Sequence, residues 1–502
     1  MDLFTRISLI IFFSFVVFRS ASSQVELVRG NIDPNPDPPR YSARSESYIF
    51  KGKVYFQAYS ASGVELWATD GTSDGTFQIA DINPGTANSS PRSFISFNDN
   101  LFFVATVGMN SWLYKTDGVS SPEQVAQCLS DTRLRVVDDK LYFTAGDLFA
   151  TDGTSAGTYL VKRLAGGTIF NSPIPHYFAD LQSHDGSLYF VHANFSQERG
   201  AIFRSDGTAN GTIRLTSNDH DVRSFLFYGD NIFFTYWNSE GNIIAAMLHI
   251  ASRAVLDLGP FEELIKIFSG KIYGLPTPYP DDGRLFVSTG TAISTFSIKS
   301  FHQARIESFT VGQSQFFFVL NGSELWRSKG TPLSTHMIKN FDGRIESLYI
   351  HNDILYFRGF DLEHGHELWR SDGTSDGTYR LLDLEPGPHS SEPHSFIEYN
   401  GSLLFSGITH EHGRSLWKLN IPAANPQMSI QSFPNPADDF LTLRADDLAG
   451  KRLLVLNIQG QPVMDLTWPQ NEKEFVLDIH RLPRGMYFMT LPGSKTMRFM
   501  KK

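Results

Sequence analysis

The chain has a single cysteine, fewer basic than acidic residues and few long apolar runs. Cys128 is the single cysteine in 502 residues, so no disulfide can form within the chain. An exported protein of this size without disulfides depends on packing alone, which favours a bacterial over a eukaryotic extracellular protein. The formal net charge of −10 argues against nucleic acid or an anionic membrane surface as a partner. A helical apolar period of about 3.6 residues is also missing.

The one long apolar run stands at the N-terminus. Arg6 precedes an apolar stretch over residues 7–18, and small residues follow up to Ser23. This stretch is too short to span a bilayer comfortably, so it is typical of a cleaved secretory signal. We expect residues 1–23 to be a signal peptide and no membrane span to remain after its cleavage.

A repeated sequence phrase is the main feature of the rest of the chain. It reads ELWATDGTSDGT over 65–76 and ELWRSDGTSDGT over 367–378, and weaker copies begin at Leu113, Leu148, Ile202 and Glu324. A hydrophobic-aromatic-aromatic triplet such as Val54-Tyr55-Phe56 accompanies it and recurs in nine copies, at steps of 39 to 48 residues. This spacing is typical of the blades of a β-propeller.

Each copy has the pattern of four short strands separated by polar turns. The second copy, for example, predicts strands at 93–97, 101–105, 112–115 and 124–129. The sequence therefore predicts an all-β fold, in which a β-propeller of eight or nine four-stranded blades occupies residues 24–420. Nine exceeds the usual range of about four to eight blades. Copies five and six (223–305) lack the DGT phrase, so both counts stay open.

The two ends of this region complement each other. Residues 25–34 resemble the fourth strand and exit of a full copy, 77–84, whereas the last copy supplies only three strands over 396–419. We therefore expect the N-terminal strand to complete the last blade, which leaves no exposed sheet edge.

The DGT phrase predicts a tight turn between the third and fourth strands. Its Asp can accept hydrogen bonds from backbone N–H groups two or three residues on, and its Gly can adopt positive φ. A calcium or sugar site in each loop is the functional alternative, but Lys329 replaces the Asp in one copy, which a metal site would not tolerate. The predicted structural turn residues are Asp70, Gly71, Asp152, Gly153, Asp206, Gly207, Asp372 and Gly373.

These residues resemble the ELWxxDGT-repeat proteins, a family of secreted bacterial proteins of poorly defined activity. The resemblance covers about residues 25–420 and is weakest in copies five and six. A looser resemblance links the phrase to the Asp-box hairpin of sialidase-type propellers, although the Ser-x-Asp spacing and terminal Trp of that hairpin are absent.

A Pro-bearing linker, 421–428, separates this region from a tail over 429–502 that predicts a small Ig-like β-sandwich. The tail closely resembles the C-terminal sorting domain of the type IX secretion system. This resemblance implies the type IX machinery and its sorting peptidase as partners, and a protein that is secreted or anchored to the outer cell surface. An unrelated Ig-like module is the alternative. The residues that carry the resemblance as a sorting signal are Pro434, Asn435, Pro436, Gly460, Gly485, Tyr487, Lys501 and Lys502.

Histidine gathers near the end of the repeat region, in equivalent turns of neighbouring copies. His and Glu together can bind zinc or another divalent ion, although exposed turns also collect these residues without a ligand. We predict no cofactor, and keep zinc or calcium as the alternative. The candidate metal ligands are Glu363, His364, His366, His410, Glu411 and His412.

No nucleophile elbow, phosphate loop, dinucleotide fingerprint or zinc-protease motif is present in the sequence. We therefore predict a non-enzymatic propeller that binds an extracellular protein or glycan. The alternative is a propeller glycoside hydrolase or lyase acting on extracellular polysaccharide. An enzyme should gather acidic and basic residues with shifted pKa values in one deep pocket. The sequence points to copies five and six, their irregular loop over 273–290, or the His-bearing turns as the place for such activity, and no catalytic residue can be chosen from it.

Overall fold

The computed structural model describes residues 25–34, 47–164, 176–194, 198–217, 220–259, 263–275, 282–291, 294–302, 304–421, 431–433, 437–444, 452–457, 461–469, 474–490 and 497–502. These residues form 44 strands and no helix, as the all-β prediction requires. The chain divides into two compact units, Met1–Asn420 and Ile421–Lys502. The predicted signal peptide and almost all of the predicted linker lie outside the described residues.

The described part of the first unit contains nine antiparallel sheets, eight with four strands and one with five. Copies five and six each form a complete sheet although they lack the DGT phrase, so the sheet count is nine. In chain order, the sheets contain β2 (Asp33–Pro34), β3 (Tyr48–Phe50), β4 (Lys53–Ser60), β5 (Gly63–Thr69) and β6 (Phe77–Ala80); β7 (Arg92–Phe97), β8 (Asn100–Val107), β9 (Asn110–Thr116) and β10 (Glu123–Cys128); β11 (Leu134–Val137), β12 (Lys140–Thr144), β13 (Leu148–Thr151) and β14 (Tyr159–Lys162); β15 (His176–His184), β16 (Ser187–Asn194), β17 (Glu198–Ser205) and β18 (Ile213–Arg214); β19 (Asp221–Tyr228), β20 (Asn231–Trp237), β21 (Ile243–His249) and β22 (Val255–Gly259); β23 (Glu263–Phe268), β24 (Lys271–Leu275), β25 (Asp282–Ser288) and β26 (Phe296–His302); β27 (Ile306–Val311), β28 (Phe316–Leu320), β29 (Glu324–Ser328) and β30 (His336–Asn340); β31 (Glu346–His351), β32 (Ile354–Asp361), β33 (Gly365–Ser371) and β34 (Tyr379–Arg380); and β35 (His394–Tyr399), β36 (Ser402–Thr409), β37 (Gly413–Asn420) and β1 (Val25–Arg29).

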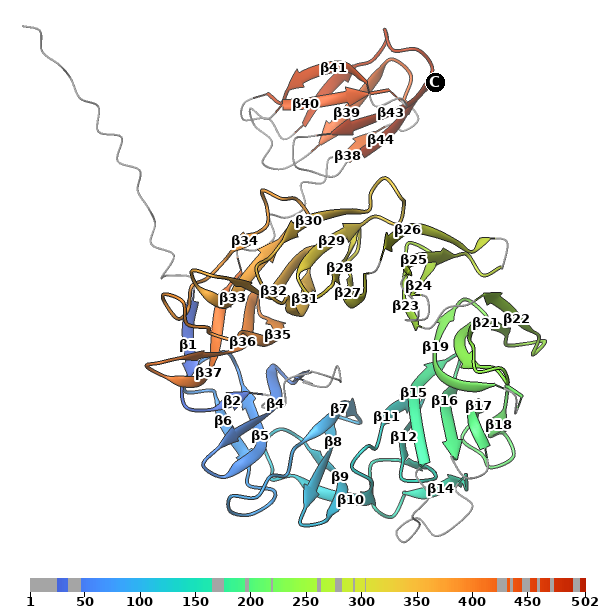
Figure 1. The fold of residues 1–502 in the computed structure, drawn as a ribbon, viewed down its shortest axis with the longest axis vertical. Helices are drawn as coiled ribbons and strands as arrows, with labels where there is room; N and C mark the ends of the chain where they lie inside the picture. The colour runs from blue at the N-terminus through green and yellow to red at the C-terminus, as the bar shows by residue number, and fades with distance from the viewer. Residues whose placement is uncertain are drawn as a thin grey trace, which may run out of the picture. The chain divides into compact units, whose positions relative to one another are not determined.

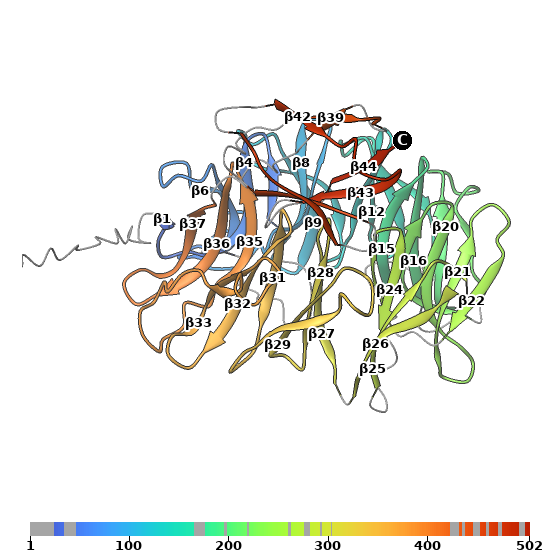
Figure 2. The same ribbon diagram turned by 90° about the horizontal axis from the view of Figure 1, so that it is seen from above.

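The nine sheets follow one another around a common centre (Figure 1), and that centre is faced by the first strands β7, β11, β15, β19, β23, β27, β31 and β35. Contacts link each first strand to the next, from β3 to β7 and onward to β35, while β2 contacts β36 and β37. Seen from above, the sheets stand side by side (Figure 2). The predicted pairing of the N-terminal strand with the last copy is present, since β1 lies antiparallel to β37 with Val25 opposite Leu419.

The two recurring phrases of the sequence meet where neighbouring sheets pack. The middle residue of a triplet lies on the second strand of one sheet and contacts the turn Gly of the following sheet, where an added Cβ would crowd or overlap the ring or its hydroxyl. Five such pairs are Tyr55 with Gly118, Phe102 with Gly153, Tyr142 with Gly207, Phe233 with Gly290, and Tyr273 with Gly330. The turn Gly is therefore required both for its positive φ and for the close approach of the neighbouring sheet.

Gly207→Ala tests this contact between sheets. Gly207 has a φ of 90°, and its added Cβ would overlap the Tyr142 hydroxyl. We expect a loss of about 2–4 kcal/mol in the free energy of unfolding, because backbone strain adds to overpacking. Gly387→Ala is the matched control, since Gly387 has a φ of 94° and no atom within 4 Å of an added Cβ. Tyr142→Phe should restore part of the loss in denaturant melts, and equal effects of the two Gly changes would contradict the interpretation.

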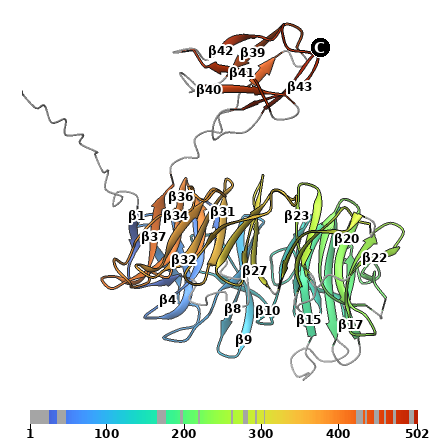
Figure 3. The ribbon, with the colours of Figure 1, turned by 45° about the horizontal axis from the view of Figure 1, so that its top comes forward.

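The described part of the second unit forms two antiparallel sheets (Figure 3), with strand orders β38-β39-β42 and β41-β40-β43-β44. Leu441 and Leu477 of the first sheet share one buried core with Val455 and Phe499 of the second, around the fully buried Trp468. The Ig-like topology stays a prediction. The strands are β38 (Gln431–Phe433), β39 (Phe440–Arg444), β40 (Arg452–Leu456), β41 (Pro462–Thr467), β42 (Glu474–Asp478), β43 (Gly485–Thr490) and β44 (Met497–Lys501).

Candidate functional site

The turn aspartates use their carboxylates within their own turns. The backbone N–H and the hydroxyl of Thr72 both donate to Asp70 Oδ1, at 2.9 and 2.6 Å, and the Thr72 hydroxyl accepts from Gly75 N–H at 3.0 Å. The same bonds recur at Asp152, Asp206 and Asp372. These bonds lower the pKa of Asp70, with its Thr72 contact as the largest cause. A self-contained turn explains these residues without a bound metal or sugar.

The Glu of the ELW phrase is a buried structural carboxylate, which the sequence interpretation missed. Glu367 has no exposed surface and accepts bonds from Leu384 N–H at 3.0 Å, Ser391 N–H at 2.9 Å and the Ser391 hydroxyl at 2.6 Å. Glu65 holds Ile82 and Ser89 in the same way. The carboxylate thus fixes the connection to the next sheet. A Glu inside an otherwise apolar third strand was the signal available in the sequence.

Glu367→Gln should change the pH dependence of stability. Burial raises the pKa of Glu367 to about 7, against its hydrogen bonds, which lower it. The folded state therefore binds more protons than the unfolded state between its unfolded pKa and about 7, so stability falls as pH rises through this window. The wild-type free energy of unfolding should drop by up to about 3 kcal/mol from pH 5 to pH 8 relative to the variant, which cannot titrate there.

Denaturant melts at several pH values measure this difference. Glu324→Gln is the control, because Glu324 occupies the same repeat position but is only half-buried and accepts from Trp326 Nε1 at 2.9 Å. A wild-type pH profile parallel to that of Glu367→Gln would contradict the prediction.

The candidate metal ligands do not converge. His364 Nδ1 lies 2.8 Å from Asp361 Oδ1, His366 packs on the Phe360 ring, and His412 Nε2 lies 3.7 Å from Glu411 Oε1. The backbone N–H of His410 donates to Glu385, and that of Glu363 to Asp361. In the described part of the chain, no three His, Cys, Asp or Glu side chains gather in a way that could hold a metal ion.

Charged side chains also gather between the seventh and ninth sheets, where Glu307, Glu346 and Glu392 are each paired with an arginine. Arg358 forms ion pairs with Glu346 and with Glu392, the latter at 2.6 Å. Arg344 pairs with Glu307 at 2.6 Å. Burial is the main cause that lowers the pKa of the neighbouring His394 to about 4, so this ring is neutral at pH 7. The pairing makes this cluster a stabilising network between sheets.

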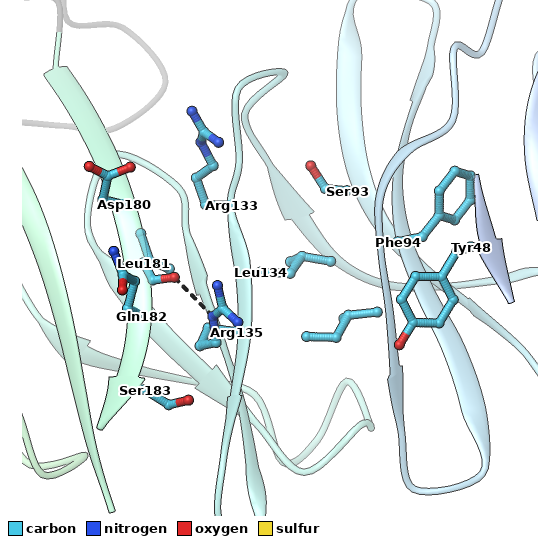
Figure 4. A pocket seen from close by; sticks show the side chains of 11 residues that line it. Tyr48, Ser93, Phe94, Arg133, Leu134, Arg135, Asp180, Leu181, Gln182 and Ser183 are labelled. Atoms are coloured by element: carbon cyan, nitrogen blue, oxygen red, sulfur yellow. Dashed lines mark hydrogen bonds between the residues drawn. The ribbon is translucent and has the colours of Figure 1, made fainter. Parts of the chain in front are cut away.

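A cavity of about 630 Å³ lies among the first strands of copies one to four. The sequence had pointed instead to copies five and six or to the His-bearing turns. The volume of this cavity falls within the range of about 300–1,000 Å³ typical of ligand sites. Figure 4 shows Tyr48 at one end of this inner-strand pocket and Asp180 with Arg133 at the other. The pocket is lined by Tyr48, Ser93, Phe94, Ile95, Arg133, Leu134, Arg135, Asp180, Leu181, Gln182 and Ser183.

Local backbone geometry shapes the inner-strand pocket. Ser93 and Asp180 both have positive φ, of 57° and 50°, and both lie where the pairing register of the first strand shifts. The Ser93 hydroxyl donates to Thr132 O at 3.1 Å, and Gln182 Nε2 donates to Phe225 O at 2.9 Å, so the connection before β11 holds one bulge and β19 holds the other.

The polar groups of the pocket differ in the hydrogen bonds and charged partners that the protein itself provides for them. Asp180 Oδ2 accepts from Phe225 N–H at 3.1 Å. Burial raises the Asp180 pKa, and this backbone bond and the charge of Arg133 lower it. Arg135 Nε donates to Leu181 O at 2.9 Å (Figure 4), and burial lowers the pKa of its guanidinium. Among the described residues, none forms an ion pair with Arg135.

Sequence reasoning did not find this pocket, because its lining comes from four copies that lie apart in the chain. One signal was present: Arg133-Leu134-Arg135 places two cations where the second copy has the uncharged Ser93-Phe94-Ile95.

Comparisons with known proteins bear mainly on the second unit. Residues 431–502 match the family described as secretion system C-terminal sorting domain. The tail is a type IX secretion sorting domain. The protein is therefore secreted or located at the cell surface. Of the sorting-signal residues, the structure places Gly485 and Tyr487 on β43 and Lys501 on β44, with Lys502 after it. Pro434, Asn435, Pro436 and Gly460 lie outside the described residues.

Solved structures resemble the chain only distantly. PorZ of Porphyromonas gingivalis, an essential bacterial surface component of the type IX secretion system, is 11% identical with a TM-score of 0.26, over 91% of this chain and 86% of PorZ. The computationally designed Ika8 protein is 13% identical with a TM-score of 0.40, over 66% of this chain and 97% of Ika8. BamB of Moraxella catarrhalis is 12% identical with a TM-score of 0.39, over 66% of this chain and 94% of BamB. Likenesses this distant identify neither the fold nor the function. No curated protein matches the chain.

Proposed function

We propose that the first unit is a nine-bladed β-propeller of the ELWxxDGT-repeat type that binds an extracellular glycan or protein. Type IX machinery exports it, and a sorting peptidase then removes the tail. The repeat phrase, the nine sheets and the pairing of β1 with β37 support the architecture. The sorting domain supports the route of export. None of the described residues forms a helix long and apolar enough to cross a membrane.

The observation that carries the binding function is the chemistry of the inner-strand pocket. Its lining includes two arginines, one tyrosine and a single carboxylate, Asp180, which already accepts a backbone N–H. Glycoside hydrolysis usually needs two carboxylates about 5–10 Å apart. Because the lining supplies one carboxylate, it favours binding over a hydrolase.

A glycan array probed with the purified first unit tests the proposal. We expect binding to a restricted set of glycans, and no new reducing ends when the unit is incubated with polysaccharide. Depletion of a polysaccharide with the appearance of reducing ends would establish the hydrolase or lyase instead.

Removal of residues 431–502 should abolish export. The sorting domain is the part of the chain that the type IX machinery recognises. Immunoblots of medium, cell surface and periplasm should find the truncated protein only inside the outer membrane. A fluorescent protein that carries residues 421–502 is the matched control and should reach the surface or the medium. Export of the truncated chain at the wild-type level would contradict the proposal.

A further inference from the structure

We infer that the inner-strand pocket selects an acidic saccharide, whose carboxylate pairs with Arg135. This inference rests on the proposed binding function and specifies the chemistry of the ligand. It depends on three features of the pocket: its charge, the orientation of one guanidinium, and a lining that mixes aromatic and polar side chains over four sheets.

The charge of the pocket opposes that of the whole chain. The lining carries two arginines and one carboxylate, Asp180, whose pKa burial raises although the charge of Arg133 acts against this rise. Arg135 is left as a half-buried cation without an anionic partner among the described residues. A cation removed from water gains most from an anion that takes the place of the lost hydration. A chain with a net charge of −10 gives an anion no general attraction, so any preference must come from this local group.

The Arg135 guanidinium is oriented for a planar anion. Its Nε donates to Leu181 O at 2.9 Å, which fixes the plane of the group and leaves the two terminal nitrogens for a ligand. Two parallel N–H donors match the two oxygens of a carboxylate in a bidentate pair. Because the protein supplies the orientation, the ligand gains specificity with little loss of side-chain freedom on binding.

The rest of the lining favours a sugar over an acidic peptide. The pocket extends over four neighbouring sheets, from Tyr48 on β3 to Gln182 and Ser183 on β15. Tyr48 is a half-buried aromatic side chain, and Ser183 and Gln182 supply a hydroxyl and an amide. A peptide that adds a strand needs an exposed sheet edge, and acidic peptide motifs are bound by clusters of arginines, whereas this lining supplies two arginines together with the carboxylate of Asp180. The lining combines the aromatic Tyr48 and Phe94 with the uncharged polar side chains of Ser93, Gln182 and Ser183, a combination that suits sugar rings and their hydroxyls.

The test compares acidic and neutral forms of one saccharide. The glycan array should show binding to uronate-containing glycans above their neutral counterparts. Trigalacturonic acid and its methyl ester are then titrated calorimetrically into the purified full chain without its signal peptide. We expect the acid to bind at least tenfold more tightly than the ester, and Arg135→Gln to weaken the acid by roughly ten- to a hundredfold, as expected for a lost charged hydrogen-bond pair.

Two further variants and an acidic hexapeptide distinguish a specific role of Arg135 from a general loss of binding. Arg204→Gln is the matched control, because Arg204 is half-buried but bonds Ser187 away from the pocket, and it should leave binding unchanged. Arg135→Lys should retain part of the affinity, and melting curves check that each variant is folded. Equal binding of acid and ester, or binding only of an acidic hexapeptide, would overturn the inference and leave the binding function intact. Absence of binding to any glycan or peptide would overturn both.

Discussion

A chain that begins at Ser47, without β1 and β2, will lose about 3–6 kcal/mol of stability and will aggregate when warmed. Val28 and Ile32 are each 3% exposed and pack with Trp67, Leu404 and Leu416, so their removal exposes apolar surface in two sheets. The truncation also leaves β37 as an open edge strand, because β1 is its neighbour. Thermal melts followed by light scattering measure both effects.

A pair of substitutions in β1 provides the control for this truncation. Val28→Asp places a carboxylate in the core and should reproduce most of the loss, because a buried unpaired charge is costly. Leu27→Asp changes the adjacent residue, which is 36% exposed, and should cost little. If the truncated chain melts like the complete one, β1 does not stabilise the first unit.

Gly377→Ser will cost about 2–3 kcal/mol in the presence of Asp372, a range typical of overpacking. A Cβ on Gly377 would overlap the Asp372 carboxylate. In two other copies the Asp is missing, as Lys329 and Thr289, and Ser334 and Ser294 stand at the position of this Gly. Their hydroxyls accept the bonds that the carboxylate accepts elsewhere, from Thr331 N–H and from Thr291 N–H, each at 3.1 Å.

The structure therefore predicts compensation between the two positions. Asp372→Thr combined with Gly377→Ser should restore all but about 1 kcal/mol, so the coupling energy in a double-mutant cycle should be about 1–2 kcal/mol. The reciprocal cycle, Lys329→Asp with Ser334→Gly, is the matched control. Additive costs in both cycles would show that the two side chains do not replace one another.

The repeat phrase and its period predicted the strands of each copy and the pairing of β1 with β37. Copies five and six were harder to interpret, because the Asp of the phrase is absent from both, and in copy six a hydroxyl takes its place. Ser294 stands in copy six at the position of Gly377, and its hydroxyl accepts the bond that the Asp carboxylate accepts elsewhere, so copy six forms a similar turn with different residues.

The inner-strand pocket could not be predicted from the sequence for a different reason. Arg135 and Leu181 are brought together by the packing of neighbouring first strands. The positive φ of Ser93 and Asp180 depends on local register shifts, which no periodic pattern in one sequence indicates. The roles of Glu65 and Glu367 were missed because each Glu was interpreted only as a letter of the repeat phrase. A carboxylate between apolar residues is also a buried group, and each of these accepts three hydrogen bonds.

The seam between β1 and β37 also sets an order of folding for the first unit. Glu26 and Asn420, which are bonded at 3.1 Å, are separated by 394 positions in the sequence. Contacts between such distant segments form late, because the chain between them must be ordered first. Eight sheets can each form from local hairpins as the chain emerges, whereas the ninth must wait for its partner from the opposite end. The N-terminal strand is thus the first part of the repeat region to be synthesised and the last to find its place.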